Sequence, residues 1–322
     1  MNIVFFGTSE VSVSALESLI QSPHRISRVV TVADKPQGRH LAIKPSPLKE
    51  AALKYGIPLY QFEDVNSGES LSALRELDPG LFVVVSFGRI LSGELIGIAP
   101  KGAINLHFSN LPLLRGAAPI QRAIAQGFDK TGVSVFYIEE KLDTGDIILQ
   151  RDVLIRPDDN SKTLSARLMK EGSQLLLEAM GKIESGEARG ISQDHGRATY
   201  AHKYKKEEMI IDWTASSREI CDLVRALDPK PNARAYLKVN GRYELIKICR
   251  AGACGPDSYP EGDKAAAGEI LEVSKDGIAV KTGDGAVRLL RLQVPGKKET
   301  DVQSFINGYT VGKGDLVKRI ND

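Results

Sequence analysis

An asparagine and a histidine two residues apart are the side chains of this sequence best suited to chemistry. Asn105 and His107 open the run NLHFSNLPLLRGAAPIQ, which proline and glycine then interrupt. If residues 102–108 form a strand, both side chains lie on one face, because strand side chains alternate with a period of two. An amide can stabilise an oxyanion, and an imidazole can move a proton. Ordinary turn chemistry accounts for such a pair equally well.

A carboxylate farther along the chain favours the catalytic interpretation. Asp143 lies in the turn KLDTGD between two apolar runs, VSVFYI and IILQRDVLI. A carboxylate placed there can orient an imidazole and balance its charge. Asn105, His107 and Asp143 are therefore the predicted catalytic residues, whereas we interpret Asp146 as turn or cap chemistry.

The chain around these residues resembles the methionyl-tRNA formyltransferase family. In that family an Asn-x-His pair, a Ser-Leu-Leu-Pro turn and a later Leu-Asp-x-Gly-Asp element build the site for a formyl-tetrahydrofolate donor. The matching elements here are Asn105-Leu106-His107, Ser109-Asn110-Leu111-Pro112 and Leu142-Asp143-Thr144-Gly145-Asp146. The similarity covers nearly the whole chain, from MNIVFFGTSEVSVSALESL through RGAAPIQRAI and ATYAHKYKKEEMIIDW to LLRLQVPGKKETDVQSFINGYTVGKGD. Asn110 departs from the usual Leu of the turn.

The resemblance implies an enzyme that transfers a formyl group from 10-formyltetrahydrofolate to the amino group of initiator methionyl-tRNA. This transfer needs stabilisation of a tetrahedral oxyanion and delivery of a proton to the departing nitrogen. We expect Asn105 to donate a hydrogen bond to the oxyanion and His107 to handle protons. Asp143 would fix the imidazole or a reacting water. The chemistry requires no metal.

The donor and the tRNA would contact different parts of the sequence. Ligands of open α/β sheets bind beyond the carboxyl ends of the strands, and the resemblance adds the turn after His107. The predicted donor-binding residues are Phe87, Gly88, Ser109, Asn110, Leu111 and Pro112. The resemblance directs tRNA to the basic loop DKPQGRHLAIKPSPLKE, where the family is usually richer in Lys, and to two lysine clusters. The predicted tRNA contacts are Arg39, Lys44, Lys203, Lys205, Lys206, Lys297 and Lys298.

Three other functions fit parts of the pattern. Formyltransferases of nucleotide-linked amino sugars and formyl-tetrahydrofolate hydrolases resemble this family in catalytic residues and two-domain plan, but the basic loop and the late PGKK segment favour tRNA. Ser109 with His107 could form an acyl hydrolase, although no G-x-S-x-G elbow surrounds the serine. A non-catalytic RNA-binding module is disfavoured because Asn105, His107 and Asp143 occur together.

The first part of the chain predicts an α/β fold. Short apolar runs at residues 2–6, 28–33 and 81–85 alternate with helical spacing such as Val13, Leu16, Leu19 and Ile20. This order is typical of β-α-β units in a Rossmann-like, parallel-rich open sheet. The turn FFGTSE lacks GxGxxG, which disfavours NAD. We expect a helix over 161–185, capped by Ser161, with a core stripe of Leu164, Leu168, Leu175, Leu176 and Met180.

The last part of the chain predicts a small OB-like β-barrel. Alternating strands in AYLKVNGRYELIKI and ILEVSKDGIAVKTGDGAVRLLRL meet at Asn240-Gly241, Asp276-Gly277 and Asp284-Gly285, residues that reach positive φ most easily in two-residue hairpins. We expect a catalytic domain over 1–189, a linker over 190–207 and a tRNA-binding barrel over 208–322.

Composition constrains these expectations only loosely. The 322 residues carry a formal net charge of +2, with 42% hydrophobic and 26% charged residues, which is ordinary for a globular protein and a weak signature for an RNA binder. The sequence shows neither a signal peptide nor an apolar run of roughly 20 residues, so we expect a cytoplasmic monomer without membrane contact. We interpret Cys221, Cys249 and Cys254 as reduced thiols, because their spacing fits no common zinc site.

Overall fold

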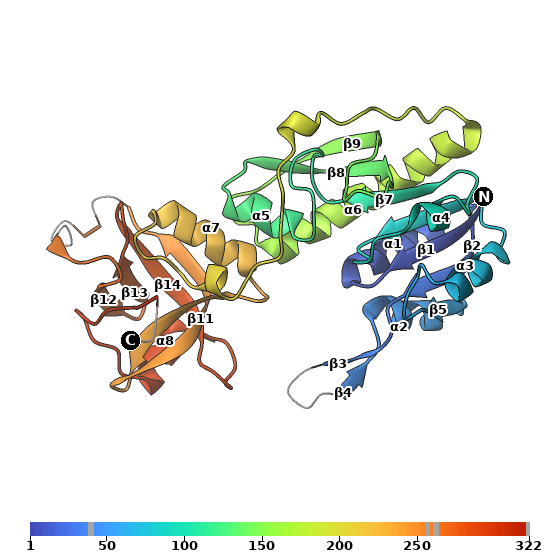
Figure 1. The fold of residues 1–322 in the computed structure, drawn as a ribbon. Coiled ribbons are helices and arrows are strands. Elements are labelled where there is room, and N and C mark those ends of the chain that lie inside the picture. The colour runs from blue at the N-terminus through green and yellow to red at the C-terminus, as the bar shows by residue number, and fades with distance from the viewer. Residues whose placement is uncertain (38–41, 256–257, 260–263, 320–322) are drawn as a thin grey trace. The chain divides into compact units, whose positions relative to one another are not determined.

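The computed structural model of the chain describes residues 1–37, 42–255, 258–259 and 264–319. Its contacts divide it into two compact units (Figure 1). Unit 1 comprises residues 1–119, 130–154 and 165–202, and unit 2 comprises residues 120–129, 155–164 and 203–322. Each unit thus draws on segments that are distant in the sequence. No helix within the described ranges is long and apolar enough to cross a membrane.

Unit 1 is built on a seven-stranded sheet in the order β5-β2-β1-β6-β7-β8-β9. Its strands are β1 (Asn2–Gly7), β2 (Arg25–Thr31), β5 (Leu59–Gln61), β6 (Leu81–Val85), β7 (Ala103–His107), β8 (Lys130–Tyr137) and β9 (Ile147–Leu154). Pairing is parallel from β5 to β7, and antiparallel where β8 joins β7 and β9 joins β8. The predicted parallel-rich open sheet is confirmed.

Helices and a short hairpin complete unit 1. The helices are α1 (Glu10–Ile20), α2 (Pro47–Lys54), α3 (Gly68–Arg75), α4 (Gly93–Ile96), most of α6 (Ser161–Ser185) and the 3-10 turn η1 (His195–Arg197). The strands β3 (Lys35–Gln37) and β4 (Ala42–Lys44) pair with each other. The central strands β1 and β6 are almost completely buried, as expected of strands covered on both faces.

The long helix α6 occupies the predicted residues, but a different residue caps it. Leu164, Leu168, Leu175, Leu176 and Met180 are all buried, which confirms the predicted core stripe. The Asn160 side-chain oxygen accepts a hydrogen bond from the Thr163 amide at 2.9 Å. Ser161, the predicted cap, instead donates its hydroxyl hydrogen to the Asp228 carbonyl. The cap prediction was wrong by one residue because this long-range partner engages the serine.

Unit 2 is an antiparallel barrel with short helices. Its strands are β10 (Ala233–Val239), β11 (Arg242–Ala253), β12 (Ile270–Ser274), β13 (Gly277–Lys281), β14 (Ala286–Gln293) and β15 (Thr300–Asp301). Its helices are α5 (Pro119–Ala125), α7 (Ser217–Leu227), α8 (Val302–Gly308) and the 3-10 turn η2 (Glu207–Met209).

The strand order and two isolated bridges confirm the small barrel-like sheet. The strands follow the order β10-β11-β14-β13-β12, and β15 pairs with β14. The C-terminal segment links the two edges of this path, because Lys318 bridges Tyr236 of β10 and Leu316 bridges Glu269 next to β12. Pairing the edges removes the exposed backbone groups of an open sheet.

Only one of the three predicted glycine turns uses left-handed backbone as expected. Asn240 and Gly241 have φ values of 51° and 81° between β10 and β11. The prediction for Asp276-Gly277 was wrong, because β13 already begins at Gly277. Gly277 has a φ of 153°, and a Cβ there would lie 2.1 Å from Arg288 Cγ, so backbone conformation and close packing both favour glycine. The prediction for Asp284-Gly285 was wrong too, since both lie in the four-residue loop 282–285.

The segment after α6 lies against unit 1 rather than apart from it. Ile191 exchanges two backbone hydrogen bonds with Ile147, of 2.8 and 2.9 Å. Farther on, Thr199 and Ala201 flank Arg115: the Arg115 amide donates to Thr199 at 2.9 Å, and the Ala201 amide donates to Arg115 at 2.7 Å. Contacts with unit 1 run as far as residue 202. The linker at 190–207 and the domain bounds drawn from it stay a prediction.

Candidate active site

Strand β7 presents the two residues singled out in the sequence. Asn105 pairs with Val84 of β6 and with Phe136 of β8, so these three residues form a row across the sheet. On the opposite face of β7, Leu106 lies where a Cβ on Gly172 of α6 would come within 3.0 Å of it. The strand therefore buries Leu106 against α6 and leaves Asn105 and His107 together on the other face, as predicted.

The amide of Asn105 carries an unsatisfied atom. Its side-chain oxygen is buried, and no hydrogen-bond partner for it occurs within the described parts of the chain. Buried polar atoms of folded proteins are nearly always paired, since an unpaired one costs free energy. An amide left in this condition is suited to a bound ligand.

The imidazole of His107 is held by the backbone. It is only 6% exposed, and its Nε2 lies 3.0 Å from the Leu114 carbonyl oxygen. A carbonyl only accepts hydrogen bonds, so Nε2 carries the hydrogen and the Nδ1 of the neutral ring has a free lone pair. Nδ1 lies 3.8 Å from the Asp143 Oδ2. His107 thus points its proton-accepting atom at the carboxylate.

Asp143 is anchored by a different group. Its side chain is 8% exposed, its backbone has a left-handed φ of 54°, and its Oδ2 accepts a hydrogen bond from the Gly116 amide at 2.7 Å. The structure brings the three predicted catalytic residues together. However, 3.8 Å is too long for a hydrogen bond, so the Leu114 carbonyl rather than Asp143 fixes the ring. The other predicted role of Asp143, to fix a reacting water, stays a prediction.

A small pocket opens at this place in unit 1. It has a volume of about 70 Å³, and the row Val84, Asn105 and Phe136 forms part of its wall. Asp143, in the connection between β8 and β9, also lines the pocket. The remaining lining residues are Arg89, Ile90, Leu91, Ile138, Glu139, Glu140, Lys141 and Leu142. A largely apolar pocket with a few converging polar groups is typical of a ligand site.

None of the predicted donor-binding residues belongs to the lining of this pocket in the described parts of the chain. Phe87 is buried, with its ring 5.5 Å from that of Phe6. Ser86 and Gly88 on either side have φ values of 52° and 73°, and a Cβ on Gly88 would meet no atom within 4 Å. Gly88 therefore faces open space while Phe87 belongs to the core. Donor contacts by either residue stay a prediction.

The turn after β7 is fixed by side chains of the neighbouring strands. Ser109 is fully buried and donates its hydroxyl hydrogen to the Leu113 carbonyl at 2.6 Å. Ser134 of β8 donates to the Ser109 carbonyl at 2.6 Å, and Gln150 of β9 donates to the Leu111 carbonyl at 3.0 Å. The Ser109 hydroxyl is thus engaged by backbone, which contradicts the acyl hydrolase alternative. No sequence motif marked Ser134 or Gln150.

Asn110, the departure from the family turn, points toward the sheet. Its amide nitrogen donates to the Thr131 carbonyl at 3.0 Å and to the Asp152 carboxylate at 2.8 Å. Its oxygen occupies space beside Gly132, where a Cβ would come within 1.8 Å. Leu111 is buried and joins Pro112 through a cis peptide bond. The substitution is therefore accommodated at β8 and β9.

The predicted tRNA contacts are spread over both units. Lys44 at the end of β4 is exposed, as are the two clusters of Lys203, Lys205 and Lys206 and of Lys297 and Lys298. Arg39 lies outside the described residues. Exposure leaves these side chains accessible to a polyanion, and contact with tRNA stays a prediction.

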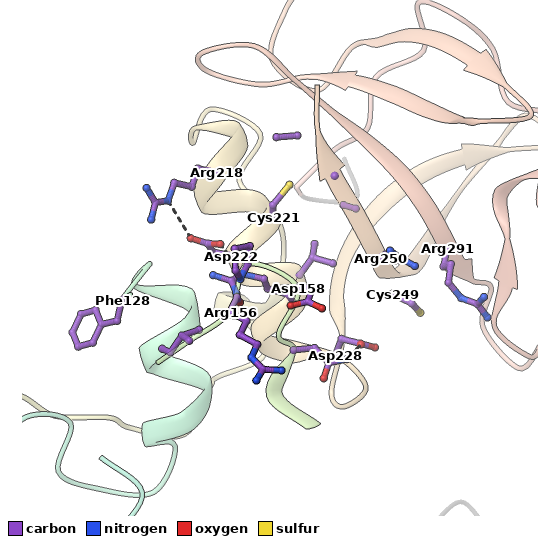
Figure 2. Close-up of a pocket in the computed structure, with 18 of the residues that line it drawn as sticks. Phe128, Arg156, Asp158, Arg218, Cys221, Asp222, Asp228, Cys249, Arg250 and Arg291 are labelled. Atoms are coloured by element: carbon purple, nitrogen blue, oxygen red, sulfur yellow. Dashed lines mark hydrogen bonds and ion pairs between the residues drawn. The ribbon is translucent and has the colours of Figure 1, made fainter. Parts of the chain in front are cut away.

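A much larger cavity, of about 980 Å³, lies within unit 2 (Figure 2). Its wall carries arginine and carboxylate side chains that pair with one another: Asp222 accepts from Arg225 Nε at 2.8 Å and lies 3.7 Å from Arg218 Nε. Cys221 and Cys249 also line it, and burial raises the pKa of the first thiol to about 11 and of the second to about 12. Over the described ranges, no group of three or more metal-ligating side chains occurs.

The chain is similar to known formyltransferases in sequence and in fold. The family model "Formyl transferase" matches residues 1–180, and "Formyl transferase, C-terminal domain" matches residues 203–310. A methionyl-tRNA formyltransferase of a Sulfurihydrogenibium species is 41% identical over 317 residues, covering 98% of this chain and 99% of the relative. The Dictyoglomus turgidum relative of the same name is 41% identical over 318 residues, covering 98% of each. The crystal structure of WlaRD, a sugar 3N-formyltransferase, shares the fold with a TM-score of 0.63 at 19% identity, covering 92% of this chain and 99% of that one.

Proposed function

The chain belongs to the methionyl-tRNA formyltransferase family, and from this we propose that it formylates the amino group of initiator methionyl-tRNA with 10-formyltetrahydrofolate as donor. The observation that carries the chemistry is the convergence of three side chains on one face of the sheet. Asn105 and Asp143 line a pocket, and the His107 Nδ1 lies 3.8 Å from Asp143.

The arrangement supports a division of roles. The Asn105 amide would donate a hydrogen bond to the oxyanion that forms when the amine attacks the formyl carbon. The His107 Nδ1 has a lone pair available, so the imidazole can accept a proton from the amine and pass one to the departing donor nitrogen. The negative charge of Asp143 would stabilise the imidazolium formed in between. In this proposal no metal takes part, and the protein acts as a cytoplasmic monomer.

The proposed tRNA contacts are Arg39, Lys44 and the two lysine clusters. A guanidinium or ammonium group that contacts phosphate positions the acceptor without touching the donor. Arg39→Ala should therefore raise the KM for charged tRNA and leave folate affinity unchanged. Loss of folate binding in this variant would refute the placement.

The first experiment measures acid-stable transfer of radiolabelled formyl from 10-formyltetrahydrofolate to methionylated initiator tRNA. Wild-type protein is compared with His107→Ala, and charged tRNA with uncharged tRNA. We expect transfer that needs both His107 and the methionyl group. Hydrolysis of the donor without transfer, or transfer only to a small amine such as a nucleotide-linked amino sugar, would overturn the RNA assignment. Comparable transfer by His107→Ala would overturn the catalytic assignment.

A further inference from the structure

Two residues of the run 114–116, which follows the buried turn, each hold one of the catalytic side chains His107 and Asp143. The Leu114 carbonyl oxygen lies 3.0 Å from the His107 Nε2, and the Gly116 amide donates to the Asp143 carboxylate at 2.7 Å. The relative placement of imidazole and carboxylate therefore depends on the backbone of residues 114–116.

The residue between them is a buried arginine. Arg115 is 2% exposed, although arginine is seldom buried without partners. Its Nε and Nη2 donate to the Gln193 side-chain oxygen at 3.2 and 2.6 Å, and its Nη2 lies 2.9 Å from the His195 Nδ1. The guanidinium thus reaches across to the segment that follows α6.

Gln193 connects this arginine to the turn that carries Asp143. Its side chain is buried, and its amide nitrogen donates to the Asp143 carbonyl at 3.0 Å and to the Gly145 carbonyl at 2.7 Å. Arginine only donates hydrogen bonds and carbonyls only accept them, so the amide fits in one orientation. Gln193 therefore joins the two backbone segments that hold the catalytic side chains.

Both segments adopt backbone that needs such support. Leu114 has φ of 58°, Gly116 of 118° and Asp143 of 54°. Non-glycine residues occupy this left-handed region at a cost and persist there only where their surroundings hold them. The Leu114 amide donates to the Thr199 hydroxyl at 2.8 Å, which adds a further restraint from the same segment.

We propose that Arg115 and Gln193 form a positioning pair that sets the His107–Asp143 geometry for formyl transfer. The pair acts through backbone, and neither residue belongs to the described lining of the 70 Å³ pocket. Disturbing it should therefore lower kcat and leave the donor KM nearly unchanged. A displacement of about 1 Å at a reacting group can cost roughly 100-fold in rate. This inference rests on the proposed roles of His107 and Asp143.

The most informative variant is Gln193→Glu in the full-length protein. It keeps the shape and the oxygen that accepts from Arg115, but replaces the donating NH2 group by an acceptor oxygen that faces the Asp143 and Gly145 carbonyls. We expect kcat for transfer to methionyl-tRNA to fall about 10- to 100-fold, with a donor KM within about 3-fold of wild type. Gln193→Met, which removes all of these hydrogen bonds, should behave alike. Transfer rates within about 2-fold of wild type in both variants would overturn the proposal.

A neighbouring residue provides the matched control. Ser192 is exposed and donates its hydroxyl hydrogen to the Asp146 carboxylate at 2.9 Å, in the same turn but on its solvent side. Ser192→Ala should keep kcat within about 2-fold of wild type, because it leaves the buried hydrogen bonds intact. A Ser192→Ala loss equal to that of Gln193→Glu would mean that any change near the turn suffices, and would overturn the proposal.

A double-mutant cycle separates positioning from a general structural role. In the Asp143→Asn background, Gln193→Glu should lower kcat by less than about 3-fold, because the charge that the pair positions is already gone. An equal fall in kcat in the wild-type and Asp143→Asn backgrounds would overturn the inference. So would a fall in kcat that is absent when the variant is assayed far below its melting temperature, because partial unfolding would then explain it. His107→Ala is measured in the same assay: full activity of this variant refutes the proposed chemistry, whereas its inactivity beside an active Gln193→Glu refutes only the positioning pair.

Discussion

The pocket in unit 1 and the cavity in unit 2 differ in how their polar groups are used. The pocket holds only about 70 Å³, yet it is lined by Asn105, whose buried amide oxygen has no described partner, and by Asp143, whose carboxylate lies 3.8 Å from the His107 Nδ1. The cavity holds about 980 Å³, and its Asp222 already pairs with Arg225 and Arg218. Volume alone would favour the unit 2 cavity, whereas uncommitted hydrogen-bonding capacity favours the unit 1 pocket as the proposed reactive site.

The largest effect should follow from removing the Asn105 side chain, whose amide nitrogen is the proposed donor to the oxyanion. Asn105→Ala deletes a preorganised donor to the oxyanion, which typically costs roughly 100- to 1000-fold in turnover. Donor binding should change much less, because the oxyanion exists only in the transition state. Steady-state kinetics with varied 10-formyltetrahydrofolate measures both quantities. Equal losses in kcat and in donor affinity would contradict the assignment.

The paired charges of unit 2 should matter for stability instead. Asp222→Ala leaves the half-buried Arg225 without its 2.8 Å partner, so we expect a loss of about 1–3 kcal/mol in the free energy of unfolding. Urea unfolding monitored by circular dichroism measures this loss, and kcat should stay within about 2-fold.

Arg218→Ala serves as the control for this pair. The Arg218 side chain is 71% exposed and lies 3.7 Å from Asp222, so its removal should cost no more than about 1 kcal/mol. A large drop in kcat for either variant would show that the cavity takes part in the reaction and would break the contrast between the two regions.

Asn110, a predicted donor-binding residue, is held through its amide nitrogen at Thr131 and Asp152, and its replacement tests whether the side chain also reaches the donor. Asn110→Leu restores the residue usual in the family, but removes the hydrogen bond to the Thr131 carbonyl and crowds Gly132. We expect a destabilisation of about 1–2 kcal/mol and an unchanged donor KM. Thermal unfolding and donor titration measure the two effects. An altered donor KM would show that this side chain reaches the donor.

The last prediction concerns neither activity nor stability but the chemical reactivity of the thiols in the unit 2 cavity. A thiol with a pKa of about 11 or 12 stays protonated until the pH approaches that value, and only the thiolate reacts. At pH 7.5 the thiolate fractions of Cys221 and Cys249 should be roughly 100- to 1000-fold or more below that of a free cysteine, so both should react more slowly with iodoacetamide, and their rates should rise as the pH is raised. Peptide mapping by mass spectrometry resolves each site. Labelling of Cys221 as fast as free cysteine would refute the burial of this thiol.

The elements of unit 1 were predictable because they are encoded locally. The apolar runs that form β1 and β6 and the leucine stripe of α6 follow the periods of strand and helix, and their boundaries differ from the predictions by few residues. The alternation of apolar and polar residues was enough to predict that unit 2 is a small antiparallel barrel. Its turns were less predictable, since Gly277 is the first residue of β13 and not a turn residue, and the loop before β14 has four residues and not two.

The amino-acid sequence by itself determined which side chains could react and that Asn105 and His107 share a face of one strand, because strand alternation is a local property. The carboxylate in the turn between two apolar runs added Asp143. Only the tertiary structure decided how these residues are held. The Leu114 carbonyl, the Gly116 amide and the Gln193 side chain come from segments up to 86 positions from His107, and their contacts depend on long-range packing that no local period records.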